Sequence, residues 1–166
     1  MAKVLTRTSK VAIFVAMLAT MSFARSKSLS DTEVAEIREG FRQSVACITT
    51  NRYPSEWCVR FRQLIFREEA KNTSAFLLGA NFGFSFKSEP TAESSGANED
   101  ELRKVAACAA NARLAYELNK AELRVTDRDI INILKVSPGQ FAGWKARLST
   151  GDPDNSVTHW SPGTDL

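Results

Sequence analysis

The stretch NEDELRKVAACAANARLAYELNKAEL, residues 98–123, is the longest periodic segment of this chain of 166 residues. Asn98 followed three positions later by Glu101 is a capping box, which is typical of a helix start. Frequent alanines raise the helix propensity and let a second helix approach closely. One face of such a helix carries the apolar residues Leu102, Val105, Ala109, Ala112, Tyr116 and Leu123. We therefore expect the central helix of a small helical domain here.

Four other segments carry helical apolar spacing, and the first begins at a second capping box, Ser30 with Glu33. These segments are residues 31–49, 55–71, 126–134 and 138–148. The composition, with 43% hydrophobic and 25% charged residues, is that of a globular chain. The sequence thus predicts a mostly α fold, a small helical domain of four to five helices over residues 30–148. We expect two helical hairpins, residues 31–71 and 98–148.

A segment of different character connects the two hairpins. Phe82, Phe84 and Phe86 alternate with smaller residues, which is a period of two, and nearby glycines weaken any helix. This pattern fits a single strand, an apolar loop packed into the helical core, or a surface that docks on another protein, for example at a sheet edge. We take the three phenylalanines as candidate protein-contact residues. Residues 87–97, KSEPTAESSGA, have the composition of a flexible linker.

The end of the chain differs in composition from the helical domain. From Ser149 onward Gly, Pro, Asp, Ser and Thr dominate, so we expect residues 149–166 to form a flexible tail. Trp160 in this tail is a further candidate for contact with a protein partner.

The first 24 residues have the layout of a secretory signal peptide. Basic residues precede an apolar run, Val11–Met21, and Ser22 and Ala24 mark a cleavage site before Arg25. Cleavage would leave the mature chain periplasmic or secreted, with membrane contact only through the targeting segment. A mitochondrial transit peptide is also basic and free of acidic residues, and would give an organellar protein instead. An uncleaved anchor needs about 20 apolar residues, which exceeds this run.

The net charge depends on that first segment. The whole chain has 22 Lys and Arg against 19 Asp and Glu, a formal charge of +3. The segment contributes Lys3, Arg7 and Lys10 and no acidic residue, so its removal leaves 19 residues of each sign. The mature chain therefore has no overall basic field to attract nucleic acid, and we do not expect a nucleic-acid partner.

The chain contains three cysteines, Cys47, Cys58 and Cys108, which lack CxxC spacing. Cys47 and Cys58 flank a predicted turn between two helices, which can bring them within disulfide distance. We therefore take Cys47–Cys58 as the candidate disulfide, formed on export. The alternative is three free, buried cysteines. Cys108 lies among alanines and is expected in the core.

Residues 126–148, TDRDIINILKVSPGQFAGWKARL, carry two short helical patterns on either side of a turn. Their apolar spacing, the turn VSP and the ending WKxR resemble the helix-turn-helix unit of phage-repressor-like DNA-binding proteins. The resemblance implies that the helix from Pro138 enters the major groove and that Lys145 and Arg147 contact DNA. The chain departs from the unit at Lys135, where a turn glycine is usual. Its reading face lacks hydrogen-bonding side chains and consists of Gly139, Ala142, Gly143 and Ala146.

Residues that would support catalysis are missing from the sequence pattern. The single histidine, His159, lies in the predicted tail, and the His, Cys and Asp residues do not have metal-ligand spacing. The sequence has no glycine-rich phosphate loop and no GxSxG or HExxH motif. We therefore expect no catalytic residues, no metal, no cofactor and no small-molecule substrate.

These observations favour an exported, non-enzymatic binding or accessory protein whose partner is another protein. Two alternatives stay open from the sequence. One is a helix-turn-helix DNA-binding protein that uses residues 126–148, and the other is an accessory subunit of a membrane or organellar complex, which fits a transit peptide.

Overall fold

The computed structural model describes residues 28–67 and 72–149. These two ranges form six helices and no strand, which confirms the predicted mostly α fold. The additional helix, beyond the five helical segments that the sequence predicted, is residues 74–94, which are helical rather than a strand or loop. The predicted signal peptide, residues 1–24, and the predicted tail beyond Ser149 lie outside the described residues. The helices are α2 (Asp31–Thr49), α3 (Pro54–Ile65), α4 (Ser74–Ser94), α5 (Glu99–Leu123), α6 (Asp127–Leu134) and α7 (Pro138–Ser149).

Five of the helices begin where the sequence has a start signal, and at α7 the Ser137 hydroxyl accepts a hydrogen bond from the Gln140 N–H at 3.1 Å. The Ser30 hydroxyl accepts a hydrogen bond from the Glu33 backbone N–H at 3.2 Å, and the Glu33 carboxylate accepts one from the Ser30 N–H at 2.8 Å. The same reciprocal pair starts α5 at Asn98 and α6 at Thr126. Pro54 occupies the first turn of α3, where a missing N–H leaves no hydrogen bond unmade.

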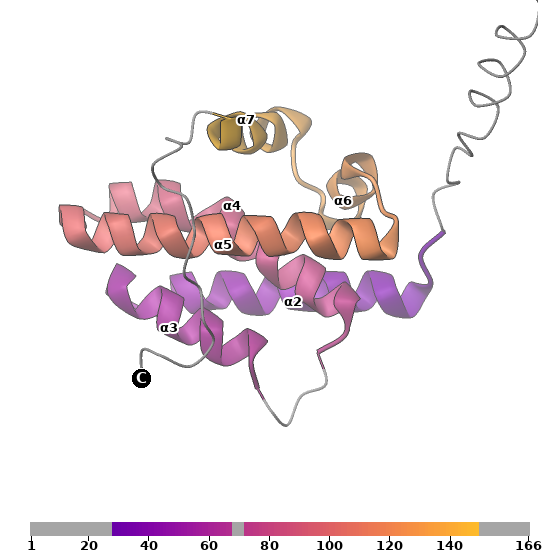
Figure 1. Ribbon diagram of the computed structural model, residues 1–166, viewed down its shortest axis with the longest axis horizontal. Helices are drawn as coiled ribbons and strands as arrows, with labels where there is room; N and C mark the ends of the chain where they lie inside the picture. Colours follow the sequence, from indigo (N-terminus) through magenta and orange to yellow (C-terminus); the bar gives the residue numbers. More distant parts are fainter. Residues whose placement is uncertain (1–27, 68–71, 150–166) are drawn as a thin grey trace, which may run out of the picture.

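α4 is the helix around which the others pack. Figure 1 shows α2 and α5 lying along it, with α3 on one side and α6 and α7 on the other. Every residue of α4 from Leu78 to Phe86 is buried, as expected for a helix that is apolar on all faces. α5, which the sequence predicted to be central, lies against α4 and exposes its outer face, including Leu114.

α2 and α4 approach closely because each has a glycine where the other backbone passes. A methyl group on Gly79 would lie 1.9 Å from the carbonyl oxygen of Ile37. A methyl group on Gly40 would lie 2.1 Å from the carbonyl oxygen of Phe76. Both distances are far shorter than van der Waals contact, so only glycine fits at these two points. Glycines that weaken an isolated helix therefore permit the packing that stabilises this one.

The alternating phenylalanines lie on two sides of α4. Because a helix turns about 100° per residue, Phe82 and Phe86 share one side and Phe84 points to the other. The Phe82 ring lies edge-on to Trp144 of α7, with centroids 5.0 Å apart, and Phe84 stacks on Phe61 of α3 at 4.2 Å. The period of two thus comes from a helix buried on both sides, not from a strand.

α4 continues through most of the predicted linker, so that prediction was wrong. Of residues 87–97, those up to Ser94 are helical, with Pro90 inside the helix. The chain then turns at Gly96, whose φ of +72° is one that glycine adopts without strain. The reason for the error is that tertiary packing of the preceding turns stabilises a helix whose last residues resemble a linker in composition.

A cluster of charged side chains fastens α6 and α7 to α5. Lys120 lies 2.8 Å from Asp127 and 2.6 Å from Glu117, and Lys145 also binds Asp127. Burial alone would raise the pKa of Asp127, but the hydrogen bonds from Lys120 and Lys145 outweigh it and lower that pKa. The ionised carboxylate of Asp127 on α6 therefore pairs with lysines from both α5 and α7 and links the three helices.

Candidate binding surface

The three phenylalanines predicted as protein contacts are core residues. The exposed fractions of Phe82, Phe84 and Phe86 are 0%, 0% and 7%. Side chains buried to this extent cannot contact a partner while the domain is folded, so this assignment was wrong. Trp160, the other contact candidate, lies outside the described residues.

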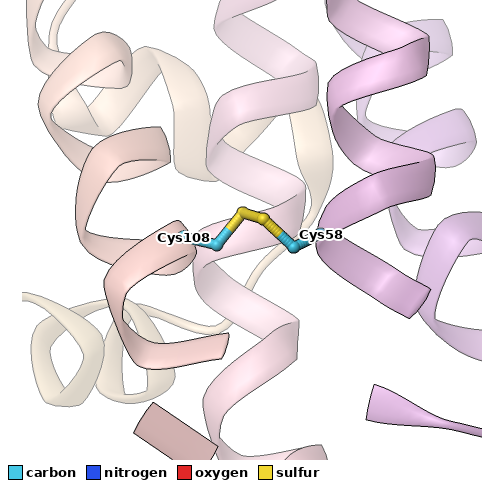
Figure 2. The surroundings of a disulfide bond; sticks show 2 residues. All are labelled: Cys58 and Cys108. Atoms are coloured by element: carbon cyan, nitrogen blue, oxygen red, sulfur yellow. A yellow bond between two sulfur atoms is a disulfide. The ribbon is translucent and has the colours of Figure 1, made fainter. Parts of the chain in front are cut away.

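The disulfide joins Cys58 to Cys108, so the predicted Cys47–Cys58 bridge was wrong (Figure 2). The two bonded residues have Cα atoms 6.1 Å apart and connect α3 to α5, which lie side by side. Cys47 is a free thiol on α2, where its sulfur donates to the carbonyl oxygen of Gln43 and burial raises its pKa. The correct partner of Cys58 comes from a helix distant in the sequence, which local turn geometry cannot reveal.

The cations that the helix-turn-helix resemblance assigns to DNA are paired with carboxylates of the domain. Lys145 binds Asp127 and lies 3.9 Å from Glu117, and Arg147 lies 3.8 Å from Glu89. The exposed face of α7 beside them presents Gly139, Ala142, Gly143 and Ala146. DNA binding by this unit stays a prediction.

Large apolar side chains are exposed on α3, at its C-cap residue Phe66, and on α5. Val59 and Phe66 are 53% and 49% exposed, and Leu114 and Leu118 are 58% and 65% exposed. Leu114 and Leu118 are four residues apart, which places them on one face of α5. The disulfide holds this face beside α3. Exposed apolar residues are common singly, but a group on two neighbouring helices is typical of an interaction site.

Between these helices lies a groove of about 510 Å³, with α4 as its floor. We call it the α3–α5 groove. Its principal lining residues are Ile65, Phe66, Leu77, Asn81, Leu114 and Leu118. Val59 is not among the residues that line it, although it lies on α3 and is similarly exposed. Arg62, at the exposed edge, is the one charged side chain among the described residues that line the groove.

The floor of the groove contains a buried amide. Asn81 is 3% exposed, and its Nδ2 donates to Asn119 Oδ1 at 3.2 Å. The Oδ1 atom of Asn81 accepts no hydrogen bond from any described residue. A buried acceptor left unpaired is rare, since it costs about 1–3 kcal/mol relative to a satisfied one. The uncharged polar side chains that line the groove are thus Asn81, Asn111 and Asn119, and Asn81 is the one whose Oδ1 is buried and unpaired among the described residues.

Sequence reasoning missed this groove, although one signal for it was present. Leu114 and Leu118 lie outside the apolar stripe that identified α5, so they form a second, shorter apolar stripe on the same helix. A second stripe without an internal partner indicates an exposed apolar face.

The described residues supply no metal centre and no membrane span. No three His, Cys, Asp or Glu side chains in these ranges are placed to bind a metal ion together. Each helix in the same ranges is too short or too polar to cross a bilayer. His159 lies outside them.

Comparisons with protein-family models, with curated proteins and with solved structures each find no match to this chain.

Proposed function

We propose that this chain is an exported, non-enzymatic binding protein that acts on another protein through the α3–α5 groove. The observation that carries the proposal is the group of exposed apolar side chains around a groove of about 510 Å³. Burial of such side chains against a partner is the main source of binding free energy. Antiparallel or parallel helix pairs with a groove between them receive the apolar face of a third helix in many complexes.

Two features support export. The Cys58–Cys108 disulfide is a bond that persists in oxidising compartments and is rare in the cytosol of mesophiles. The first 24 residues have the composition of a signal peptide. The disulfide also fixes the separation of α3 and α5, so the partner would meet a groove whose walls are already in place.

Site-specific photo-cross-linking in the native host tests the proposal. A photoreactive amino acid replaces Leu118 in one variant and Val59 in a matched control, since the two are similarly exposed but only Leu118 lines the groove. We expect a discrete protein adduct from position 118 and little or none from position 59. Equal adducts from both positions, or none from 118, would contradict the proposal.

A further inference from the structure

We propose that a second pocket, between α2 and α3, binds a small oxyanion ligand that carries two or more negative charges on phosphate or carboxylate groups. We call it the α2–α3 pocket. It has a volume of about 380 Å³ and shares no lining residue with the α3–α5 groove. The inference therefore goes beyond the proposed function and requires no protein partner. Its principal polar lining residues are Arg42, Gln43, Cys47, Arg60, Gln63 and Arg67.

The pocket is formed by the polar faces of two neighbouring helices. α2 and α3 lie side by side (Figure 1). Gln43 and Cys47 are four residues apart and share one face of α2, and Arg60 and Gln63 are three apart on one face of α3. Arg67 follows the end of α3 and completes the lining. Long polar side chains therefore converge on one space from both helices.

The pocket has an excess of positive charge. Three of its lining residues are arginines, and none of the described lining residues is acidic. Glu39, which is not part of the lining, neutralises Arg42, whose Nε donates to it at 2.9 Å. Arg60 and Arg67 form no ion pair with any described carboxylate. Both lie close enough to Cys47 for their charges to oppose the rise in its pKa that burial causes, so two uncompensated cations act on the same space.

The hydrogen-bonding groups of the wall also favour an anion. Acceptors that would repel one are already covered: Asn51 donates to the carbonyl oxygen of Cys47 at 2.7 Å, and the Cys47 thiol donates to that of Gln43 at 3.5 Å. Gln63 Oε1 accepts from Arg60 at 3.5 Å. The N–H groups of the guanidinium and amide side chains are the donors left for a ligand, and the planar guanidinium pairs with two oxygens of a phosphate or carboxylate at once.

The distribution of charge along the chain supports the same ligand class. Residues 25–166 contain 19 basic and 19 acidic residues, but residues 42–67 contain five arginines and a single acidic residue, Glu56. The positive charge of an otherwise balanced chain is therefore concentrated around this pocket, which attracts anions from solution. A volume of about 380 Å³ lies within the range of small-molecule sites. Two separate cations call for a ligand with at least two negative charges.

Cys47 is a built-in reporter for this site. In the oxidised chain it is the free thiol, and it lines the pocket. Its alkylation by iodoacetamide, an uncharged reagent, is followed by intact mass while inorganic pyrophosphate or citrate is added at an ionic strength held constant with potassium chloride. We expect either anion to slow alkylation saturably, by about tenfold at ten times its Kd. The tighter of the two identifies the preferred group as phosphate or carboxylate.

Variants that remove one charge locate the anion. Arg60→Gln and Arg67→Gln keep a long polar side chain, and each should weaken protection by about threefold to tenfold. Arg128→Gln makes the same change at an exposed position of α6 outside the pocket and should leave the affinity unchanged. Each alkylation rate is compared with that of the same variant without ligand, and the melting temperature establishes that each variant folds.

Three outcomes would overturn the inference. No slowing by either anion beyond that of potassium chloride would show that the pocket binds neither class. Equal losses in Arg128→Gln and in the two pocket variants would show general attraction to a charged surface. Full protection in both Arg60→Gln and Arg67→Gln would place the anion elsewhere. Each of these outcomes leaves the proposed function standing, because that function uses different lining residues.

Discussion

The two sides of α4 differ in how completely other helices cover them. On one side, Phe82 and Phe86 are covered by Trp144 and its neighbours on α7, and no large apolar side chain of that cluster is exposed. On the other side, α3 and α5 leave a groove whose floor contains Asn81 and whose edges expose Phe66, Leu114 and Leu118. The covered side therefore contributes most to the stability of the fold, while the open side leaves an apolar groove exposed.

The largest loss of stability is expected when a large side chain is removed from the covered side of α4. Trp144→Ala removes a side chain that is 0% exposed and packs against four aromatic rings, and should destabilise the domain by about 3–5 kcal/mol. Leu118→Ala on the open side should change stability by less than about 0.5 kcal/mol, because Leu118 is 65% exposed. Urea unfolding measures both. Similar losses in the two variants would remove the distinction between the sides.

Loss of the disulfide should produce the next largest effect. Cys58 and Cys108 are separated by 50 residues, for which the chain-entropy model gives a stabilisation of about 4 kcal/mol. The double variant Cys58→Ser/Cys108→Ser should therefore unfold at a markedly lower urea concentration, and its groove should lose affinity because α3 is no longer fixed. Cys47→Ser is the matched control, since Cys47 is free. A control that loses as much stability as the double variant would contradict the observed pairing.

The crossing of α2 and α4 should be sensitive to a single methyl group. Gly79→Ala places that methyl against the backbone of Ile37 and should cost about 1–3 kcal/mol. Gly143→Ala on the exposed face of α7 meets no atom within 4 Å, and should instead stabilise its helix by up to about 1 kcal/mol. Thermal unfolding of the two variants gives opposite signs if the close crossing is real.

Low pH should reduce the stability of the domain by protonating Asp127, which links α6 to α5 and α7. Since its pKa is lowered in the folded chain relative to an unfolded value of about 3.9, its contribution is complete above about pH 5 and disappears as the pH falls through the folded-state value. The partly exposed cluster should contribute about 0.5–1 kcal/mol at neutral pH. Asp127→Asn should therefore be less stable than the unsubstituted chain at pH 7, and the difference should shrink as the pH falls below the unfolded-state pKa and through the lower folded-state pKa of Asp127. A pH-independent difference would contradict this role.

The smallest effect is expected for DNA. Because Lys145 and Arg147 lie beside carboxylates, we expect no salt-dependent retention of the folded domain on duplex DNA. Lys145→Ala should leave the amount retained on DNA unchanged. Retention that falls steeply with salt and weakens in Lys145→Ala would instead favour the helix-turn-helix alternative.

The sequence was sufficient to predict those helices that have one apolar face and an N-terminal cap. α2, α5 and α6 each begin at the capping box that the sequence shows. α4 escaped prediction because it is buried on all sides, so that its residues lack the single-face periodicity of a surface helix. Its alternating phenylalanines and its glycines both favoured other structures locally, and only the approach of α2 explains Gly79.

The candidate site was less predictable because it depends on which helices become neighbours. Cys58 pairs with Cys108 across 50 residues of sequence, and no local rule selects that partner over Cys47. The same contact between α3 and α5 creates the groove. Leu118 was visible in the sequence as an apolar residue of a helix, but its exposure follows from the packing of α3 beside it.

The most direct test of the proposal that the chain is exported and that a disulfide holds its groove is a non-reducing peptide map of the chain recovered from its native host, together with its intact mass. The account predicts a chain that begins at Arg25, is two hydrogens lighter than its reduced form, and contains a Cys58–Cys108 peptide pair with Cys47 free. A chain that retains residues 1–24 with all three cysteines reduced, or one with Cys47 in the bridge, would contradict it.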